Sequence, residues 1–220
     1  MFPISPPGVY APQADTAMLM SALRRELLPP DAEVLDIGTG TGVLAIEAAR
    51  HGAARVTAVD ASAAAVLTVR LNALLSGYAR TVRARRGDLL APVAGERFDL
   101  VLANPPYVPS PHRGLPRRGA GRAWNAGPDG RGVLDRLCEQ VPDRMRRGGV
   151  LLMVHSALSG PASTVRRLTE AGLDAAVVDR RYVPFGPVLR GRAAWLRDAG
   201  LIEPGQEKEE LVVIRAERPH

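Results

Sequence analysis

Cysteine is almost absent from this 220-residue chain, and its scarcity excludes several kinds of site. Cys138 has no second cysteine to pair with, so no disulfide can form within the chain, and a reducing cytoplasm fits this composition. The four histidines lie far apart and show no zinc-ligand spacing, so we expect no metal site. They are His51, His112, His155 and His220.

Long apolar runs are also missing. No stretch approaches the roughly 18–20 apolar residues that a membrane-spanning helix needs. The first 15 residues lack the basic start and apolar core of a secretory signal. We therefore expect one soluble domain over residues 1–220 with a sizeable core and no membrane partner. Its expected parts are an arm and helix (1–30), a central core (31–155) and C-terminal strands (156–220).

Lysine is the third scarcity, because Lys208 is the only lysine among 29 basic residues. The net charge of +6 and the pI of about 10.3 suit an acidic partner such as nucleic acid. An arginine excess this lopsided, in a chain rich in alanine and glycine, also fits a genome-wide base composition. A solvated arginine-rich surface is therefore the simpler interpretation.

Strand-like and helix-like segments alternate from residue 33 onwards. Strands are predicted at 33–37, 55–59, 81–86, 98–103, 149–156, 174–179 and 210–216. Helices are predicted at 15–28, with Asp15 as N-cap, and at 43–51, 62–76, 131–146, 161–171 and about 188–199. This alternation predicts an α/β fold, a doubly wound, mostly parallel seven-stranded sheet with helices on both faces. Ligands of such sheets bind beyond the carboxyl ends of the strands.

A glycine-rich turn follows the first predicted strand, in "VLDIGTGTG" at 34–42. Asp36 ends the strand, and Gly38, Gly40 and Gly42 then alternate with threonines before a helix begins. Glycines let the backbone approach a ligand closely, and a helix N-terminus offers free N–H groups. The spacing departs from the G-x-G-x-x-G of dinucleotide sites. It favours a ligand without a pyrophosphate, such as S-adenosylmethionine.

Acidic residues follow the next two strands. Asp60 ends "VTAVD" and can accept hydrogen bonds from both hydroxyls of a ribose. Asp88, in "RGDLL", can accept from an adenine amino group, while the N–H of Leu89 can meet a ring nitrogen. Each residue alone is compatible with an ordinary turn. Their order after the glycine turn favours a nucleoside site.

The sequence "NPPY" at 104–107 follows the fourth strand, "FDLVLA". Neither proline has a backbone N–H, and each holds the residue before it extended, so the corner is rigid. The side-chain carbonyl of Asn104 and the main-chain carbonyl of Pro105 are two fixed acceptors for the hydrogens of one –NH₂ group. Tyr107 can pack flat against that group. The corner therefore suits a planar amide or an aromatic amine as methyl acceptor, although a plain proline turn is the alternative.

In this order, the four motifs resemble class I S-adenosylmethionine-dependent N-methyltransferases with an Asn-Pro-Pro-Tyr motif, above all the short form of release-factor glutamine methyltransferases. The resemblance runs from about residue 8 to 155 and includes "VYAPQADT" (9–16) and "AWNAGPDGRGVLDRL" (123–137). Ala126-Gly127 stands where the family has a glycine pair. Bacterial members add an N-terminal helical domain, for which this chain has no room, and short relatives depend on a small partner protein.

The resemblance implies a role for each motif residue. Thr16, Asp36 and Gly38 would hold the methionine end of S-adenosylmethionine, within the turn that includes Gly40 and Gly42. Asp60 would hold the ribose, Asp88 and Leu89 the adenine, and Asn104, Pro105 and Tyr107 the substrate amide, with Asn104 also beside the cofactor. S-adenosylhomocysteine would be the product.

The methyl acceptor is left open among three classes. A protein glutamine side chain, as in release factors, is the first, and an exocyclic amine of adenine or guanine in RNA or DNA is the second. A small molecule or a peptide natural product is the third. Two long segments bear on this choice, since long loops are often functional. The loop 108–130 contains Arg113, Arg117, Arg118 and Arg122, which could contact phosphates, and residues 180–209 could shape a small pocket.

Overall fold

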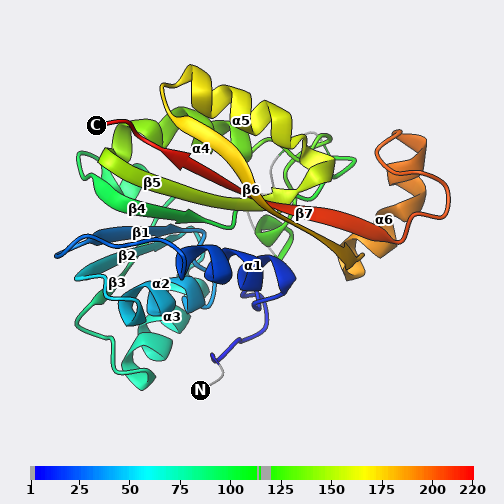
Figure 1. Ribbon diagram of the computed structural model, residues 1–220. Helices are drawn as coiled ribbons and strands as arrows, with labels where there is room; N and C mark the ends of the chain where they lie inside the picture. Colours follow the sequence, from blue (N-terminus) through cyan, green and yellow to red (C-terminus); the bar gives the residue numbers. More distant parts are fainter. Residues whose placement is uncertain (1–2, 113, 115–119) are drawn as a thin grey trace.

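The computed structural model describes residues 3–112, 114 and 120–220, and within them the strands form one seven-stranded sheet (Figure 1). The strands are β1 (Glu33–Ile37), β2 (Arg55–Asp60), β3 (Val82–Arg86), β4 (Phe98–Ala103), β5 (Met145–Ser156), β6 (Asp174–Pro184) and β7 (Lys208–Glu217). The helices are α1 (Ala14–Leu23), α2 (Val43–Arg50), α3 (Ala63–Leu75), α4 (Leu134–Gln140), α5 (Pro161–Glu170) and α6 (Pro187–Asp198). Short 3₁₀ turns are η1 (Ala91–Val93), η2 (Ala120–Ala123), η3 (Pro142–Arg144) and η4 (Ala157–Ser159).

The strand order is β3-β2-β1-β4-β5-β7-β6. The first five of these strands run parallel, and β7 lies antiparallel to both β5 and β6. Helices α1, α2 and α3 cover one face of the sheet, while α4 and α5 cover the other (Figure 1). The expected doubly wound, mostly parallel α/β sheet is thus confirmed. The order reverses between β1 and β4, which opens a crevice at their carboxyl ends.

The central strands are apolar along nearly their whole length because helices cover them on both faces. Leu35 on β1, Leu100 and Leu102 on β4, and Leu151 on β5 are at most 1% exposed. Burying a leucine side chain stabilises the fold by about 1.5–3 kcal/mol. These four side chains therefore hold the strands that carry the glycine turn and the proline corner.

Two predicted helices are shorter in the structure. Helix α1 ends at Leu23, five residues before the expected end, and Leu27, which the apolar pattern included, is 96% exposed. The helix expected over 131–146 is confined to Leu134–Gln140, because Pro142 has no N–H to continue it. Strand β5 already begins at Met145, which pairs with Phe98 of β4. The register then shifts, and regular pairing resumes with Leu100 and Val150.

The segment 180–209 is less of a loop than its composition suggests. Strand β6 continues to Pro184 and pairs with β7 as far as Lys208. Helix α6 lies between them, close to its predicted bounds, and projects beyond the end of this strand pair (Figure 1). It packs through a small apolar cluster of its own, which contains Phe185, Leu189, Leu196 and Ile202.

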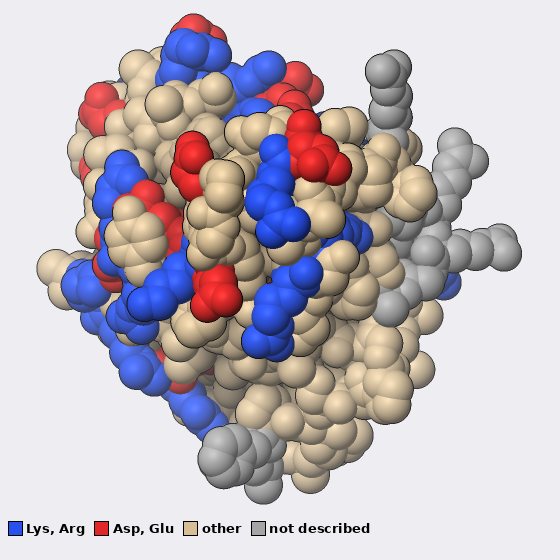
Figure 2. Space-filling model, turned by 90° about the vertical axis from the view of Figure 1, so that its right-hand side faces the viewer, with Lys and Arg blue, Asp and Glu red and all other residues tan. Residues whose placement is uncertain are grey.

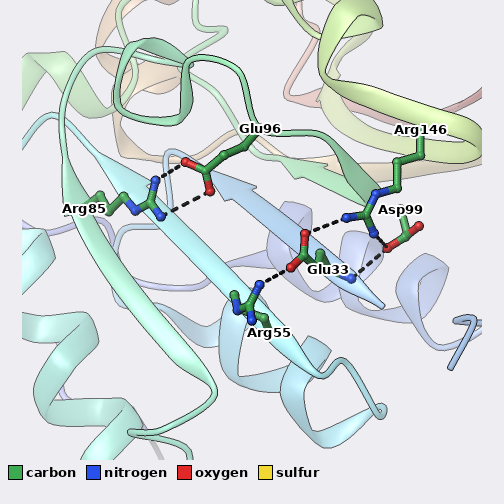
Figure 3. A network of polar contacts seen from close by, with 6 residues as sticks. All are labelled: Glu33, Arg55, Arg85, Glu96, Asp99 and Arg146. Atoms are coloured by element: carbon green, nitrogen blue, oxygen red, sulfur yellow. Dashed lines mark hydrogen bonds and ion pairs between the residues drawn. The ribbon is translucent and has the colours of Figure 1, made fainter. Parts of the chain in front are cut away.

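Ion pairs tie the amino ends of the strands together (Figure 3). Glu33 on β1 pairs with Arg146 on β5 and with Arg55 on β2, and Arg146 also pairs with Asp99 on β4 at 2.6 Å. The main-chain N–H of Glu33 donates to Asp99 as well. This network lies at the opposite edge of the sheet from the carboxyl ends of the strands, where ligands of such folds bind.

Among the described residues, no helix combines the length and the apolar character needed to cross a bilayer.

Candidate active site

A cleft of about 1380 Å³ opens at the carboxyl ends of β1, β2, β3 and β4. Its wall includes most of the residues that the sequence singles out, namely Gly38, Gly40, Asp60, Asp88, Leu89, Asn104, Pro105 and Tyr107. The four motifs, which span 34–107 in the sequence, therefore meet around a single hollow. Thr16, Asp36 and Gly42 do not line the cleft; they contact residues that form or support its wall.

The glycine turn between β1 and α2 forms one side of the cleft. Gly38, Gly40 and Gly42 have φ angles of 72°, 54° and 81°, a region that side chains rarely adopt. A Cβ atom on Gly38 would lie 3.4 Å from the carbonyl oxygen of Asn104, and one on Gly40 would lie 3.3 Å from that of Tyr10. Glycine is thus needed both for the turn and for its close approach to the proline corner and the N-terminal segment.

Asp60 reaches from the end of β2 into this turn. Its Oδ2 accepts a hydrogen bond from the N–H of Gly40 at 3.0 Å, and its Oδ1 accepts from the N–H of Ser62 at 2.8 Å. A carboxylate oxygen can accept more than one hydrogen bond, so both oxygens retain capacity toward the cleft. Asp60 can therefore hold the turn and a pair of ligand hydroxyls at once.

Asp36 lies beneath the turn and is fully buried. Its Oδ2 accepts from the hydroxyl of Thr39 at 2.6 Å and from the N–H of Ala45 at 3.1 Å, whereas its Oδ1 has no partner among the described residues. Burial raises the pKa of Asp36 to about 7, although the bond from Thr39 opposes that shift. Gly42 also supports the turn from behind, where a Cβ would collide with Val69 on α3. The structure therefore gives Asp36 and Gly42 contacts that shape the turn.

The far end of the cleft contains Asp88 and Leu89. Leu89 has a φ of 47°, which is uncommon for a residue with a side chain and is a form of strain found at ligand sites. The carboxylate of Asp88 is paired with Arg136 of α4 at 2.5 Å, and Arg136 lines the same cleft. Sequence reasoning missed Arg136, since nothing in its helix marks it as a partner of Asp88.

The proline corner closes the cleft beside the glycine turn. The side-chain Nδ2 of Asn104 donates to the hydroxyl oxygen of Thr16 at 3.3 Å. Because its nitrogen is engaged there, the Oδ1 of Asn104 is the atom left to accept from a ligand. The main-chain oxygen of Tyr107 accepts from the hydroxyl of Ser159 at 2.7 Å, which anchors the other end of the corner. Asn104 and Tyr107, the two ends of "NPPY", are thus each fixed by a hydrogen bond to another segment.

Asp15 is the centre of a buried group that the sequence prediction misjudged. It is not the N-cap of α1, because that helix begins at Ala14 with Gln13 at the cap position. Its carboxylate is 3% exposed and accepts from Tyr10 at 2.6 Å, from Tyr107 at 3.0 Å and from the N–H and hydroxyl of Thr16. The only sequence signal was that Tyr10 and Asp15 both belong to "VYAPQADT".

The two tyrosines of this group stay protonated. Burial raises the pKa of Tyr10 and of Tyr107 far above the usual value, and the negative charge of Asp15 adds to both shifts. Their hydroxyls therefore act as donors to Asp15 and hold the N-terminal segment against the proline corner.

Glu209, the second residue of β7, also lines the cleft and was not singled out from the sequence. It is 7% exposed, and its Oε2 has no partner among the described residues. Burial raises its pKa to about 7, with a contribution from the charge of Asp15 and an opposing one from a hydrogen bond with Ser156. The available signal was that Glu209 stands shortly before the apolar run 211–214.

Helix α6 and the segment after the proline corner form the outer wall. Pro187, Val188 and Leu189 line the cleft together with Trp124 and Asn125. Arg192 of α6 fastens the two parts, since it donates to the main-chain oxygen of Pro109 at 2.7 Å and to the side chain of Asn125. Arg113, Arg117 and Arg118, considered above as phosphate contacts, lie outside the described residues, as does the side chain of Arg122.

The family model and the curated relatives that match this chain are methyltransferases. A family model described as the methyltransferase small domain matches residues 4–114. A putative protein N5-glutamine methyltransferase of Methanocaldococcus jannaschii is 33% identical over 183 residues, which are 83% of this chain and 90% of that protein. A release factor glutamine methyltransferase of Moorella thermoacetica is 35% identical over 162 residues, which cover 71% of this chain but only 57% of its own length.

A solved structure extends this likeness to three dimensions. A chain of the E. cuniculi Mtq2–Trm112 complex, described as responsible for methylation of the eRF1 translation termination factor, superposes with a TM-score of 0.62 at 27% identity. The match covers 96% of this chain and 99% of that one.

Proposed function

This chain belongs to the methyltransferase small domain family and is therefore an S-adenosylmethionine-dependent methyltransferase, and we propose that its acceptor is the side-chain amide of a glutamine in a protein. The names of the Methanocaldococcus and Moorella relatives favour glutamine, and that of the Moorella relative favours a release factor as substrate. The single observation that carries the proposal is the orientation of Asn104. Its nitrogen donates to Thr16, and its oxygen, which has no hydrogen-bond partner among the described residues, can receive an amide hydrogen.

The cleft suits the cofactor that the family uses. The close approach of Gly40 to Tyr10 leaves a narrow backbone cradle at one end, where the methionine part of S-adenosylmethionine would lie along Gly38 and Gly40. Asp60 would accept hydrogen bonds from the ribose hydroxyls. Asp88 would accept one from the adenine amino group, and the main-chain N–H of Leu89, a residue with a positive φ, would donate to an adenine ring nitrogen. When bound, S-adenosylmethionine supplies an electrophilic methyl group on its sulfonium.

Asn104 and Pro105 would do most of the work on the substrate. An amide nitrogen attacks poorly because its lone pair is spread over the carbonyl. The Oδ1 of Asn104 and the carbonyl oxygen of Pro105 would each hold one N–H, so that the nitrogen faces the methyl group in one orientation. Orientation of this kind can supply up to about 7–11 kcal/mol of a barrier. The nitrogen would release its proton to water, and no metal is required.

Protein is favoured over nucleic acid by the surface charge that can be described. On the face shown in Figure 2, acidic side chains are interspersed among the basic ones. Several arginines are already paired, such as Arg25 with Asp179 and Arg180 with Glu210. A polyanion needs a run of unpaired cations to displace its counterions.

The test is a transfer assay with S-adenosylmethionine carrying a labelled methyl group. The purified protein is incubated with a recombinant release factor and, separately, with a cell lysate that is then divided between protease and nuclease. We expect label in the release factor, located on glutamine by mass spectrometry, and loss of the lysate label with protease alone. If the label disappears with nuclease alone, and its incorporation falls steeply with rising salt concentration, the acceptor is RNA or DNA.

A matched pair of variants tests the grip itself. Asn104→Ala should nearly abolish turnover while binding of S-adenosylmethionine, measured by calorimetry, survives. Asn125→Ala, at an asparagine on the same cleft that is bonded to Arg192, should retain most of the turnover. Equal turnover in the two variants would remove Asn104 from the mechanism. Adding a small Trm112-like protein to each assay shows whether this chain needs a partner, as its E. cuniculi neighbour has.

A further inference from the structure

Glu209 lines the cleft, and its carboxyl group lacks a complete set of hydrogen-bond partners among the described residues. It lies on β7, before the residues that pair with β5. Its negative charge contributes to the raised pKa of Tyr107. It is 7% exposed, and its Oε2 has no hydrogen-bond partner among the described residues. A buried polar atom without a partner costs free energy, so its presence at the wall of a cleft calls for a functional explanation.

The groups around Glu209 are already committed to one another. Tyr10 and Tyr107 both donate their hydroxyl protons to Asp15, and Thr16 donates to the same carboxylate. No proton on the two tyrosines is therefore left for a substrate, and Asp15 has three side-chain donors of its own. Of the described residues in this cluster, Glu209 is the member with a buried polar atom that has no hydrogen-bond partner.

A carboxamide substrate has one polar atom that the proline corner does not satisfy. Under the proposed function, Asn104 and Pro105 take the two amide hydrogens. The amide oxygen then still needs a donor, because a buried carbonyl without one is costly. We infer that Glu209, in its neutral acid form, donates a hydrogen bond to the carbonyl oxygen of the substrate amide and so helps the cleft to bind carboxamides. This inference rests on the proposed function.

The protonation state agrees with that role. Burial raises the pKa of Glu209 to about 7, so a large share of the protein has the proton in place at neutral pH. The charged or titratable groups that face it are Asp15 from α1, Tyr10 from the N-terminal segment and Tyr107 from the proline corner. The charge of Asp15 favours the neutral form of Glu209, and an acceptor oxygen bound to the proton would favour it further.

The experiment compares Glu209→Gln and Glu209→Ala with the unmodified protein on the release-factor substrate from pH 6 to 9. In the unmodified protein, kcat/KM should decline as the pH rises through the pKa, by about the tenfold that loss of the donor costs, because only the neutral acid donates. Glutamine keeps an N–H donor at every pH, so Glu209→Gln should retain activity and lose this alkaline decline. Glu209→Ala should raise KM for the substrate about tenfold with kcat little changed. Calorimetric binding of S-adenosylmethionine and a thermal melt establish that both variants are folded.

Three outcomes would overturn the inference. If both variants keep the KM of the unmodified protein, Glu209 does not contact the substrate. If Glu209→Gln is as weak as Glu209→Ala and activity is lost toward acid pH, the carboxylate acts as an anion or proton acceptor. If the unmodified protein leaves glutamine unmethylated but labels another acceptor, the proposed function fails and this inference with it. That last result is distinct, because it is seen before any variant is made.

Discussion

The hydroxyl of Thr16 and the side-chain nitrogen of Asn104 lie 3.3 Å apart, although 88 residues separate them in the chain. Thr16 is at the start of α1, and Asn104 follows β4. Thr16 in turn donates to Asp15 at 3.1 Å, so its oxygen is left to accept from Asn104. The orientation of the Asn104 side chain thus depends on the packing of the N-terminal segment against the proline corner.

Replacing Thr16 by valine should therefore lower kcat. Valine has the same shape but no hydroxyl, so the amide of Asn104 would lose the contact that orients it, and misplacement of a positioning group can cost on the order of 100-fold. Because Thr16 does not line the cleft, we expect the dissociation constant of S-adenosylmethionine to change little. Steady-state kinetics and calorimetry measure the two quantities separately.

Thr16→Ser is the matched control, since serine restores the hydroxyl and should restore most of the rate. The resemblance to known methyltransferases implies instead that Thr16 holds the methionine end of the cofactor. If Thr16→Val loses S-adenosylmethionine binding in proportion to its loss of rate, that role is the right one, and the orientation of Asn104 is not what limits turnover.

Local patterns were sufficient for the elements that carry the motifs. Strands β1 and β4 have their predicted bounds, because an apolar run ended by a glycine turn or a double proline has little alternative as a buried parallel strand. The predicted carboxyl-end motifs meet in one cleft for the same reason, since parallel strands bring their carboxyl ends to one edge.

Local sequence patterns could not predict contacts between segments that lie far apart in the chain. Asp15 stands at a helix start, and its sequence position suits a cap equally well as a buried acceptor for Tyr107, 92 residues away. Glu209 is buried where β7 returns antiparallel to β6 and pairs it with Val183, a feature that is not visible in its neighbours along the chain. The end of α4 was misjudged because one helix was expected through Pro142, whereas this residue starts the 3₁₀ turn that leads into β5.

Gly40→Ala should weaken binding of S-adenosylmethionine about tenfold or more. A Cβ at this position would lie 3.3 Å from the carbonyl oxygen of Tyr10, and φ is 54°, so the turn must move away from the N-terminal segment. Gly52→Ala is the matched control, since Gly52 also has a positive φ, 102°, but open space around it. Both variants should lose about 1 kcal/mol of stability. Equal cofactor affinity in the two would contradict the cradle assigned to Gly40.

Arg146→Gln should destabilise the fold without changing catalysis. Arg146 joins Glu33 and Asp99 at the amino ends of the strands, away from the cleft. Because these side chains are partly exposed, we expect a loss of about 1 kcal/mol in urea denaturation, and a smaller loss at high salt. Arg166→Gln, in an exposed pair with Glu170 on α5, should cost almost nothing. A salt-independent loss would point to packing of the arginine stem instead of charge.

The stability of the fold should depend on pH through the ionisation of Glu209, the buried acid of β7. Burial raises the pKa of Glu209 from 4.5 to about 7, so between these values the folded protein retains a proton that the unfolded chain has released. The stability that goes with this proton is fully present below pH 4.5 and is lost as the pH rises to about 7. Glu209→Gln removes that dependence, so the variant should gain relative to the unmodified protein from pH 4.5 to 8, by up to about 3 kcal/mol. Urea denaturation at several pH values measures the difference, and a gap between the two proteins that stays constant with pH would show that Glu209 ionises in the fold as it does in the unfolded chain.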